Sequence, residues 1–292
     1  MSDGKRVERR SPDDLFGLLA DETRIGIVRA LGEAEGSLRF SALRDRVGVA
    51  DSGNFNYHLD RLVGVLVADT EEGYELTRSG AELFGSVLAG TYTADAVVDP
   101  VTPDWDCQLC GGETVVDYGN ERARFRCRDC DEGARFPFPP GSVEQFDRSE
   151  LPAAFARWWH GTVTRLVDGF CPVCAGRLDR ALAGPGGGDE RQSSPESVQF
   201  DCRRCGETAR VSASTLATFQ PVVEGFLGEH GFDLRTRHPS QVWAELDDWE
   251  TTVRSASPRR LTVRFGHGGE VVTVDIDENA AVETVDRRTA ES

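Results

Sequence analysis

Residues 52–80 read SGNFNYHLDRLVGVLVADTEEGYELTRSG, and this stretch decides the fold of the N-terminal part of the chain. At about 100° per residue, Phe55, Leu59 and Leu62 share one face of a helix. Gly64 ends this helix, and the segments LVADT and YELT, joined by a Glu-Glu-Gly turn, predict an antiparallel hairpin. The stretch therefore predicts a helix that is followed directly by a hairpin.

Helical patterns flank this stretch on both sides. A first helix begins at residues 11–14, a second follows Asp21, and a third ends at Gly48. A short strand at residues 38–40 and a last helix after the hairpin complete the pattern. The order helix, helix, strand, helix, helix, hairpin, helix predicts a winged helix-turn-helix domain over residues 11–96.

Several of these segments resemble ArsR-type transcriptional regulators of haloarchaeal type. LLADETRIGIVRAL is similar to the second-helix signature of that family, and SGNFNYHLDRLVGVLV with GYELTRSG resembles its recognition helix, wing and exit. The resemblance covers residues 11–92 and implies a homodimer, packed through its first and last helices, that binds operator DNA. Metal sensing by the family's cysteines does not carry over, because the first cysteine of this chain is Cys107.

The predicted recognition helix has a polar face opposite its apolar one. Asparagine can pair with adenine and arginine with guanine in the major groove of double-stranded DNA. A glycine in the first turn would let the helix approach the duplex closely. The candidate DNA contacts are Ser52, Gly53, Asn54, Asn56, Tyr57 and Arg61. A solvated helix face is the alternative interpretation, because the same residue types are common on such faces.

Acidic residues in the predicted hairpin argue against a DNA contact by that element. Asp69, Glu71, Glu72 and Glu75 lie where basic residues usually meet phosphate, and residues 1–96 carry 17 acidic against 11 basic residues. Three explanations stay open. The hairpin does not touch DNA, cations bridge it to phosphate at high salt, or the domain binds protein instead.

All eight cysteines fall into four C-x2-C pairs. Two such pairs joined by a hairpin supply four thiolates at tetrahedral spacing, as in zinc ribbons. The predicted zinc ligands are Cys107, Cys110, Cys127 and Cys130 in one site, and Cys171, Cys174, Cys202 and Cys205 in the other. Four thiolates leave no open coordination position, which favours a structural role. A redox dithiol and an iron–sulfur cluster fit the spacing less well.

The cysteine-rich half contains an internal repeat. FRCRDCDEGAR at residues 125–135 and FDCRRCGETAR at residues 200–210 are identical at seven of eleven positions. A helical pattern follows each copy, at about 150–168 and 214–230. The repeat predicts a duplicated ribbon-plus-helix module.

The C-terminal segment predicts one more small domain. Residues 241–253, QVWAELDDWETTV, form an amphipathic helical pattern, and the strands RLTVRF, GEVVTVDID and AVETVDR follow. The expected fold class is thus α+β and multidomain. Its expected domains are a winged helix-turn-helix at 11–96, ribbon-plus-helix modules at 104–170 and 171–232, and a helix with a three-stranded antiparallel meander at 233–288.

Two clusters in the cysteine-rich half have alternative interpretations. Arg122, Arg124, Arg126 and Arg128 share one face of a predicted strand, where ion pairs with neighbouring acids are favoured over contacts with phosphate. Leu151, Phe155, Trp158 and Trp159 crowd one helix, either as core residues or around a hydrophobic ligand pocket between the two modules.

Composition excludes several classes of protein. The 292 residues include 50 acidic and 33 basic side chains, which gives a net charge of −17, and Lys5 is the single lysine. This balance is typical of halophilic proteins. No segment has the length and apolarity of a membrane helix or a secretory signal, so we expect a soluble cytoplasmic protein without a membrane partner. No nucleophile–base pair or phosphate-binding loop predicts an enzyme.

The sequence therefore favours a DNA-binding transcriptional regulator with a zinc-stabilised effector or assembly domain. The alternative is a protein-interaction scaffold of the transcription machinery, in which the winged helix and the ribbons bind protein. The sequence identifies neither an operator nor an effector ligand nor a protein partner.

Overall fold

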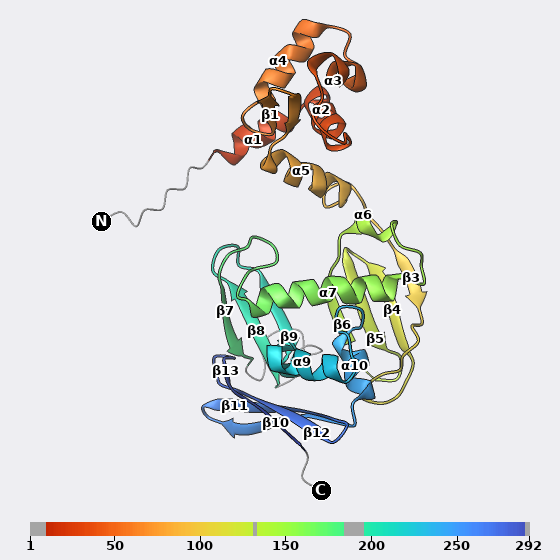
Figure 1. The fold of residues 1–292 in the computed structure, drawn as a ribbon, viewed down its shortest axis with the longest axis vertical. Coiled ribbons are helices and arrows are strands. Elements are labelled where there is room, and N and C mark those ends of the chain that lie inside the picture. Colours follow the sequence, from red (N-terminus) through yellow and green to blue (C-terminus); the bar gives the residue numbers. More distant parts are fainter. Residues whose placement is uncertain (1–9, 131–132, 184–195, 290–292) are drawn as a thin grey trace, which may run out of the picture. The chain divides into compact units, whose positions relative to one another are not determined.

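A computed structural model describes residues 10–130, 133–183 and 196–289, and it divides into two compact units. The first unit comprises the residues up to Asp95 together with 139–142, and the second comprises the remainder. Helices and antiparallel sheets make up both units, which confirms the predicted α+β class (Figure 1).

The first unit has the order of elements that the sequence predicts, with one difference. Its elements are α1 (Pro12–Leu19), α2 (Glu22–Gly32), α3 (Phe40–Val47), α4 (Ser52–Leu62), β1 (Val67–Thr70), β2 (Gly73–Leu76) and α5 (Arg78–Leu88), with residues from α6 (Pro140–Val143). The expected strand at 38–40 is reduced to a single bridge between Leu38 and Tyr74, because α3 already begins at Phe40.

Side-chain caps fix where α2 and α4 begin. The Asp21 carboxylate accepts hydrogen bonds from the backbone N–H groups of the second and third residues after it, at 3.0 and 3.3 Å. Asp51 makes the same pair of bonds ahead of α4, at 2.7 and 2.9 Å. Gly48 ends α3 with a φ of 81°, a conformation that favours glycine. The helix that carries the candidate DNA contacts therefore has a firmly defined start.

The core of the first unit joins α4 to the other helices. Ile27, Leu43, Phe55 and Leu59 are completely buried, and the ring of Phe55 meets that of Phe40 edge-on at 5.3 Å. Burial of each such side chain contributes about 1.5–3 kcal/mol. The apolar face of α4 is thus held in the core, and its opposite face is left to solvent.

Gly80→Ala is expected to destabilise the first unit by about 1–3 kcal/mol. A Cβ atom at residue 80 would lie 2.1 Å from the carbonyl oxygen of Leu66. The backbone of α5, or that of Leu66 just before β1, must therefore move. Gly85→Ala on the same helix is the matched control, because its Cβ would meet no atom within 4 Å. Hydrogen exchange over residues 22–88 measures the effect. Equal protection in both variants would contradict this packing.

The second unit consists of three antiparallel sheets and several helices. Its elements are β3 (Val98–Val101), β4 (Thr114–Gly119), β5 (Arg122–Cys127), β6 (Gly133–Pro137), α7 (Leu151–Val167), β7 (Leu178–Leu182), β8 (Ser197–Cys202), β9 (Thr208–Ser212), α8 (Ala213–Thr218), α9 (Pro221–Glu229), α10 (Pro239–Glu245), β10 (Asp248–Ala256), β11 (Arg259–His267), β12 (Glu270–Ile276) and β13 (Val282–Thr289). None of the described helices has the length and hydropathy needed to cross a membrane.

One continuous hydrophobic core runs through the second unit. It includes residues from the sheets β3–β6, β7–β9 and β10–β13 and from the helices between them. The long helix α7 packs on the first of these sheets, where Phe155 stacks on Tyr118 at 5.9 Å and Trp159 on Phe136 at 4.8 Å. Apart from residues 139–142, the three domains expected at 104–170, 171–232 and 233–288 therefore lie within one compact unit.

The C-terminal part differs from the sequence prediction at two places. The helix expected at 241–253 ends at Glu245, and residues 248–256 form β10, so the sheet has four strands in the order β10-β11-β12-β13 instead of three. The β-branched run from Thr251 to Val253 favours a strand, and pairing with β11 satisfies its backbone. The helix expected at 214–230 is divided into α8 and α9, because Pro221 cannot donate a backbone hydrogen bond.

Candidate functional site

The structure brings the eight cysteines together as the two predicted groups of four. Within each group the sulfur atoms all lie within 4.8 Å of one another. Measured Sγ–Sγ distances are 3.5–3.6 Å in the first group and 3.5–3.7 Å in the second. Four sulfurs around a tetrahedral ion at the usual zinc–sulfur distance would stand about 3.8 Å apart. Each group could therefore hold a metal ion with little rearrangement.

Two tight turns present the first pair of sulfurs in each group. The backbone N–H of Gly111 donates to the carbonyl of Cys107 at 2.8 Å, and that of Ala175 donates to Cys171 at 2.9 Å. Both Gly111 and Ala175 adopt positive φ values, 69° and 53°. The same C-x2-C turn thus forms in both copies of the repeat.

Gly176 leaves room for the second group. A Cβ atom at this position would lie 3.0 Å from the sulfurs of both Cys174 and Cys202. Any side chain here would crowd two of the four thiolates. The space kept by this glycine fits a compact cluster of sulfur ligands.

Backbone N–H groups favour thiolate at equivalent positions of the two groups. Burial raises the pKa of Cys127, but N–H groups of the second and third residues after it outweigh this effect and lower the pKa to about 7. The corresponding N–H groups lower the pKa of Cys202 to about 6. Thiolate is the form that binds metal, so these hydrogen bonds favour one metal-binding thiolate in each group.

The two copies of the repeat also share one strand register. In the first copy Cys127 pairs with Thr114, and Phe125 pairs with Ala134. In the second copy, Cys202 pairs with Leu178, and the Phe200–Ala209 pair repeats the register of Phe125 and Ala134. Equivalent residues of the repeat therefore occupy equivalent places in the two sheets.

Ion pairs account for most of the arginine row on β5. Arg124 and Arg126 both reach Asp117, whose carboxylate is almost completely buried on β4. Arg128 pairs with Glu113 at 3.0 Å. The favoured interpretation of the row, ion pairing, thus describes three of its four members. Their partners are Asp117 on β4 and Glu113 just before β4, which are not next to the arginines in sequence.

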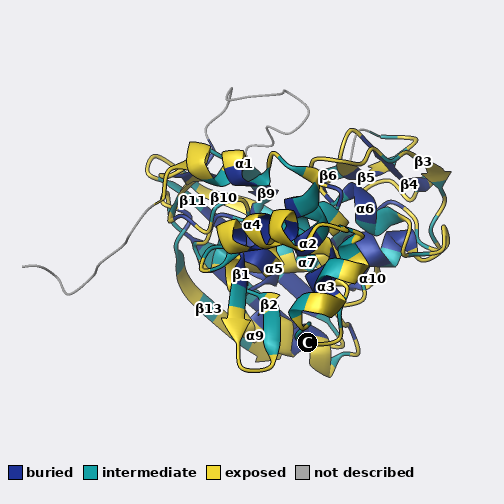
Figure 2. Ribbon diagram, turned by 90° about the horizontal axis from the view of Figure 1, so that it is seen from above, coloured by how far each residue is buried: buried dark blue, intermediate teal, exposed yellow. Residues whose placement is uncertain are grey.

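The candidate DNA contacts lie together on the solvent side of α4. Ser52, Gly53, Asn54, Asn56, Tyr57 and Arg61 are all exposed. Figure 2 shows exposed and buried segments alternating along this helix. His58 belongs to the opposite side, where it is buried with Nδ1 3.3 Å from the Asp21 carboxylate. The sequence pattern therefore correctly predicts which side of α4 is buried and which is exposed.

Acidic side chains cover the neighbouring hairpin. Asp69, Glu71, Glu72 and Glu75 are all exposed. Burial raises the pKa of Tyr74 on β2, and the negative charges of Asp69 and Asp60 raise it further. The hairpin surface is therefore negatively charged, as its sequence indicates.

Apart from residues 139–142, the two family matches fall in different compact units. A family model described as "Domain of unknown function (DUF7351)" matches residues 104–282, more than half of the chain. The chain belongs to this family. A second model, described as "Domain of unknown function (DUF7347)", matches residues 12–87. No curated protein matches the chain.

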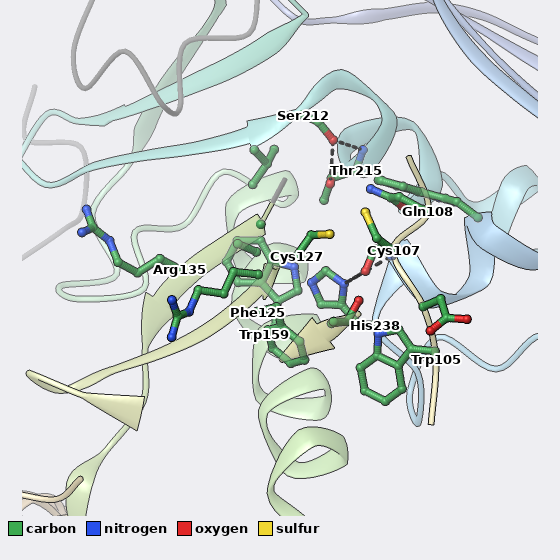
Figure 3. Close-up of a pocket in the computed structure, with 18 of the residues that line it drawn as sticks. Trp105, Cys107, Gln108, Phe125, Cys127, Arg135, Trp159, Ser212, Thr215 and His238 are labelled. Atoms are coloured by element: carbon green, nitrogen blue, oxygen red, sulfur yellow. Dashed lines mark hydrogen bonds between the residues drawn. The ribbon is translucent and has the colours of Figure 1, made fainter. Parts of the chain in front are cut away.

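The DUF7351 region contains a cavity that borders the first cysteine group. Its volume is about 220 Å³, and its walls come from both copies of the repeat and from the segment around α10. Figure 3 shows His238 among the side chains that line it, close to Phe125 and Trp159. Sequence reasoning did not identify His238, because no local pattern reveals that the chain brings it to residues more than 70 positions away.

His238 is a neutral, buried group of the DUF7351 region. Its ring stacks on Phe125 at 4.8 Å, and burial lowers its pKa from 6.5 to about 3. Its Nδ1 accepts a hydrogen bond from the backbone N–H of Ser240 at 3.2 Å, which caps α10. The ring thus joins the helix start to the cavity wall.

Because burial lowers the pKa of His238, we expect the free energy of unfolding to decrease as the pH is lowered. Below pH 6.5 the unfolded chain binds a proton on His238 that the folded chain does not bind until about pH 3. Burial of the neutral His238 ring therefore costs no stability above pH 6.5, and the free energy of unfolding decreases as the pH falls below that value. Between pH 7 and pH 5 the wild type should lose about 2 kcal/mol more than His238→Gln. Urea unfolding followed by tryptophan fluorescence measures both, and identical losses would refute the assignment.

Proposed function

We propose that this protein is a DNA-binding transcriptional regulator that reads the major groove with α4. The observation that carries the proposal is the exposed face of that helix, on which Asn54, Asn56 and Arg61 lie opposite a completely buried apolar face. Amide and guanidinium groups are the ones that pair bidentately with adenine and guanine. The Asn56 amide donates to the Asp60 carboxylate at 2.8 Å and would exchange this bond for one to a base edge.

The arrangement around α4 supports the same proposal. A helix, a turn and a second helix, followed by a hairpin, is the order found in winged helix-turn-helix domains. In this chain α3 and α4 provide the two helices, and β1 and β2 provide the hairpin. The resemblance to ArsR-type regulators adds the expectation of a homodimer on operator DNA.

We further propose that both cysteine groups hold zinc as a structural ion. Tetrahedral sites made of four thiolates are typical of structural zinc. The ion would be held by all four sulfurs of a group and would supply no reaction chemistry, because no coordination position is left open. Its contribution is folding free energy for sheets that have little core of their own.

In vitro selection tests the DNA-binding proposal directly. The zinc-loaded full chain is incubated with a library of random duplex DNA, and bound sequences are amplified through several rounds. We expect a defined motif to be enriched, and a symmetric motif if the chain binds as a dimer. Recovery of unenriched sequence after repeated rounds would contradict the proposal.

The acidic hairpin favours a second candidate, a protein-interaction scaffold. Asp69, Glu71 and Glu72 would repel phosphate at low salt, whereas a basic surface on a protein partner would attract them. Affinity purification from native cells separates the candidates. A partner that is retained by Asn54→Ala/Arg61→Ala, without recovered DNA, would favour the scaffold.

A further inference from the structure

We propose that the outer face of the sheet β3–β6 binds the phosphate backbone of duplex DNA without reading its sequence. This face lies in the second compact unit and carries the arginine row that begins at Arg122. The inference rests on the proposed DNA binding only for the identity of the partner. Its evidence is the charge of the face, its unpaired arginines, a duplicate sheet that lacks the row, and the kind of side chains that the face exposes.

Strand alternation separates the outer face of this sheet from its core face. Phe125 on β5 is buried in the core. Arg122, Arg124 and Arg126, which alternate with the core residues of β5, therefore point to the outer face. On β6, Arg135 pairs with Arg124 in the strand register and shares that face. Figure 3 shows the side chain of Arg135 directed away from Phe125.

The outer face carries positive charge in a chain whose net charge is −17. The strands β4, β5 and β6 contain four arginines and one acidic residue, Asp117, which gives +3. The buried Asp117 carboxylate is shared by Arg124 and Arg126. The first cysteine group, which would carry a net charge of about −2 with a zinc ion, lies at the far end of β5. Its ligand Cys127 is about 16 Å along the strand from Arg122.

Arg122 and Arg135 form no ion pair with any residue that the structure describes, and both are exposed. Acidic residues flank the strands at Glu113 and Glu121. Glu113 is engaged by Arg128 at 3.0 Å, and Glu121 lies in the turn between β4 and β5. Two guanidinium groups of this face can therefore meet an external anion. Guanidinium binds phosphate oxygens through two parallel hydrogen bonds.

The arrangement of Arg124 and Arg135 also favours a bound anion. Like charges directly opposite each other on adjacent strands destabilise a sheet. The Arg124 guanidinium is drawn toward β4, because its Nε donates to Asp117. Arg135 is thus left at the β6 edge without a carboxylate. A phosphate group on this face would offset the repulsion between the two arginines.

The second copy of the repeat shows that such a sheet folds without the arginine row. In β8, Ser197, Gln199 and Asp201 occupy the positions that the three arginines occupy in β5. The strands β7, β8 and β9 contain two arginines and two acidic residues, so their charges balance. The row is therefore a property of the first copy and not a requirement of the fold, which favours a role in binding.

Duplex DNA fits this face better than a protein or a single-stranded nucleic acid does. None of the exposed large apolar side chains among the described residues lies on β4, β5 or β6. Protein interfaces depend on apolar and aromatic anchors, and single-stranded nucleic acids stack their bases on aromatic side chains. The backbone of a duplex requires neither, because arginines that meet its phosphates gain affinity by releasing counterions.

Binding of the zinc-loaded full chain to a fluorescein-labelled duplex of scrambled sequence tests the proposal, because base reading by α4 contributes nothing to it. Arg122→Gln/Arg135→Gln removes the two unpaired arginines and leaves the ion pairs of Asp117 intact. Arg177→Gln/Arg180→Gln is the matched control, since it removes the same charge from exposed residues of the second copy. Fluorescence anisotropy measures the affinity at several salt concentrations at which circular dichroism shows every variant folded.

We expect Arg122→Gln/Arg135→Gln to bind the duplex about tenfold more weakly than the control. The decrease of log affinity with log salt concentration should be less steep by about 2, because two phosphate contacts are lost. Equal affinity and equal slope in the two double variants would overturn the proposal. Binding of polyglutamate that depends on these two arginines, with no effect on the duplex, would also overturn it in favour of an acidic protein. Failure of the proposal for α4 would appear differently, as a wild type that does not prefer a selected motif over the scrambled duplex.

Discussion

Cys127→Ser is expected to reduce the bound zinc from two ions to one per chain and to destabilise the second unit by several kcal/mol. Cys127 ends β5, and its sulfur stands 3.5 Å from that of Cys110. With three thiolates the first group loses its closed tetrahedral site. Because the sheets of both cysteine groups share one hydrophobic core, the loss should lower the stability of the whole unit instead of one loop.

Elemental analysis and thermal unfolding measure this effect together. All five tryptophans lie in the second unit, so their fluorescence reports its unfolding separately from the first unit. Leu109→Ser is the matched control, because Leu109 lies between two ligands of the same group and is 59% exposed. Full zinc content and unaltered melting in Cys127→Ser would refute the proposed grouping of ligands.

Asn54→Ala/Arg61→Ala is expected to weaken specific DNA binding by about 100-fold or more, since a bidentate base contact contributes about 1–3 kcal/mol. Both side chains are exposed, and neither belongs to the buried face of α4. The fold should therefore be preserved, and weak sequence-independent binding should remain.

The affinity for the selected motif and for a scrambled duplex is measured at the same salt concentration. Arg29→Ala is the control for the loss of one positive charge, because Arg29 is an exposed residue of α2. Circular dichroism establishes that the fold is retained. An unchanged preference for the motif in the double variant would show that α4 does not read the DNA.

The acidic hairpin sets a condition on any DNA complex. At molar salt the Debye length is about 3 Å, so repulsion between the hairpin and phosphate is largely screened. At low salt the same charges would oppose binding. DNA affinity that increases with salt concentration over part of the range would be consistent with this surface, whereas most DNA-binding proteins lose affinity as salt increases.

Local patterns in the sequence predict much of the fold and of the two cysteine groups. Asp21 and Asp51 cap helices through neighbours two and three residues away, and the C-x2-C pairs form turns whose geometry is set by adjacent residues. Such features depend on short-range contacts. They can therefore be recognised without knowledge of the tertiary structure.

Features that depend on distant contacts were predicted less well. Trp249 fits the apolar side of a helix, but pairing with Phe265 on β11 makes it part of a strand. The cavity around His238 depends on Phe125 and Trp159, which no local pattern connects to it. Positions of this kind become visible only when the fold places the segments side by side.

Genome-wide DNA occupancy of the tagged protein in its native cells tests the central claim most directly. The wild type and Asn54→Ala/Arg61→Ala would be compared at equal expression. The account predicts discrete peaks with a shared motif in the wild type and their loss in the variant. Peaks that persist in the variant, or occupancy without discrete sites, would contradict the proposal that the exposed face of α4 recognises DNA.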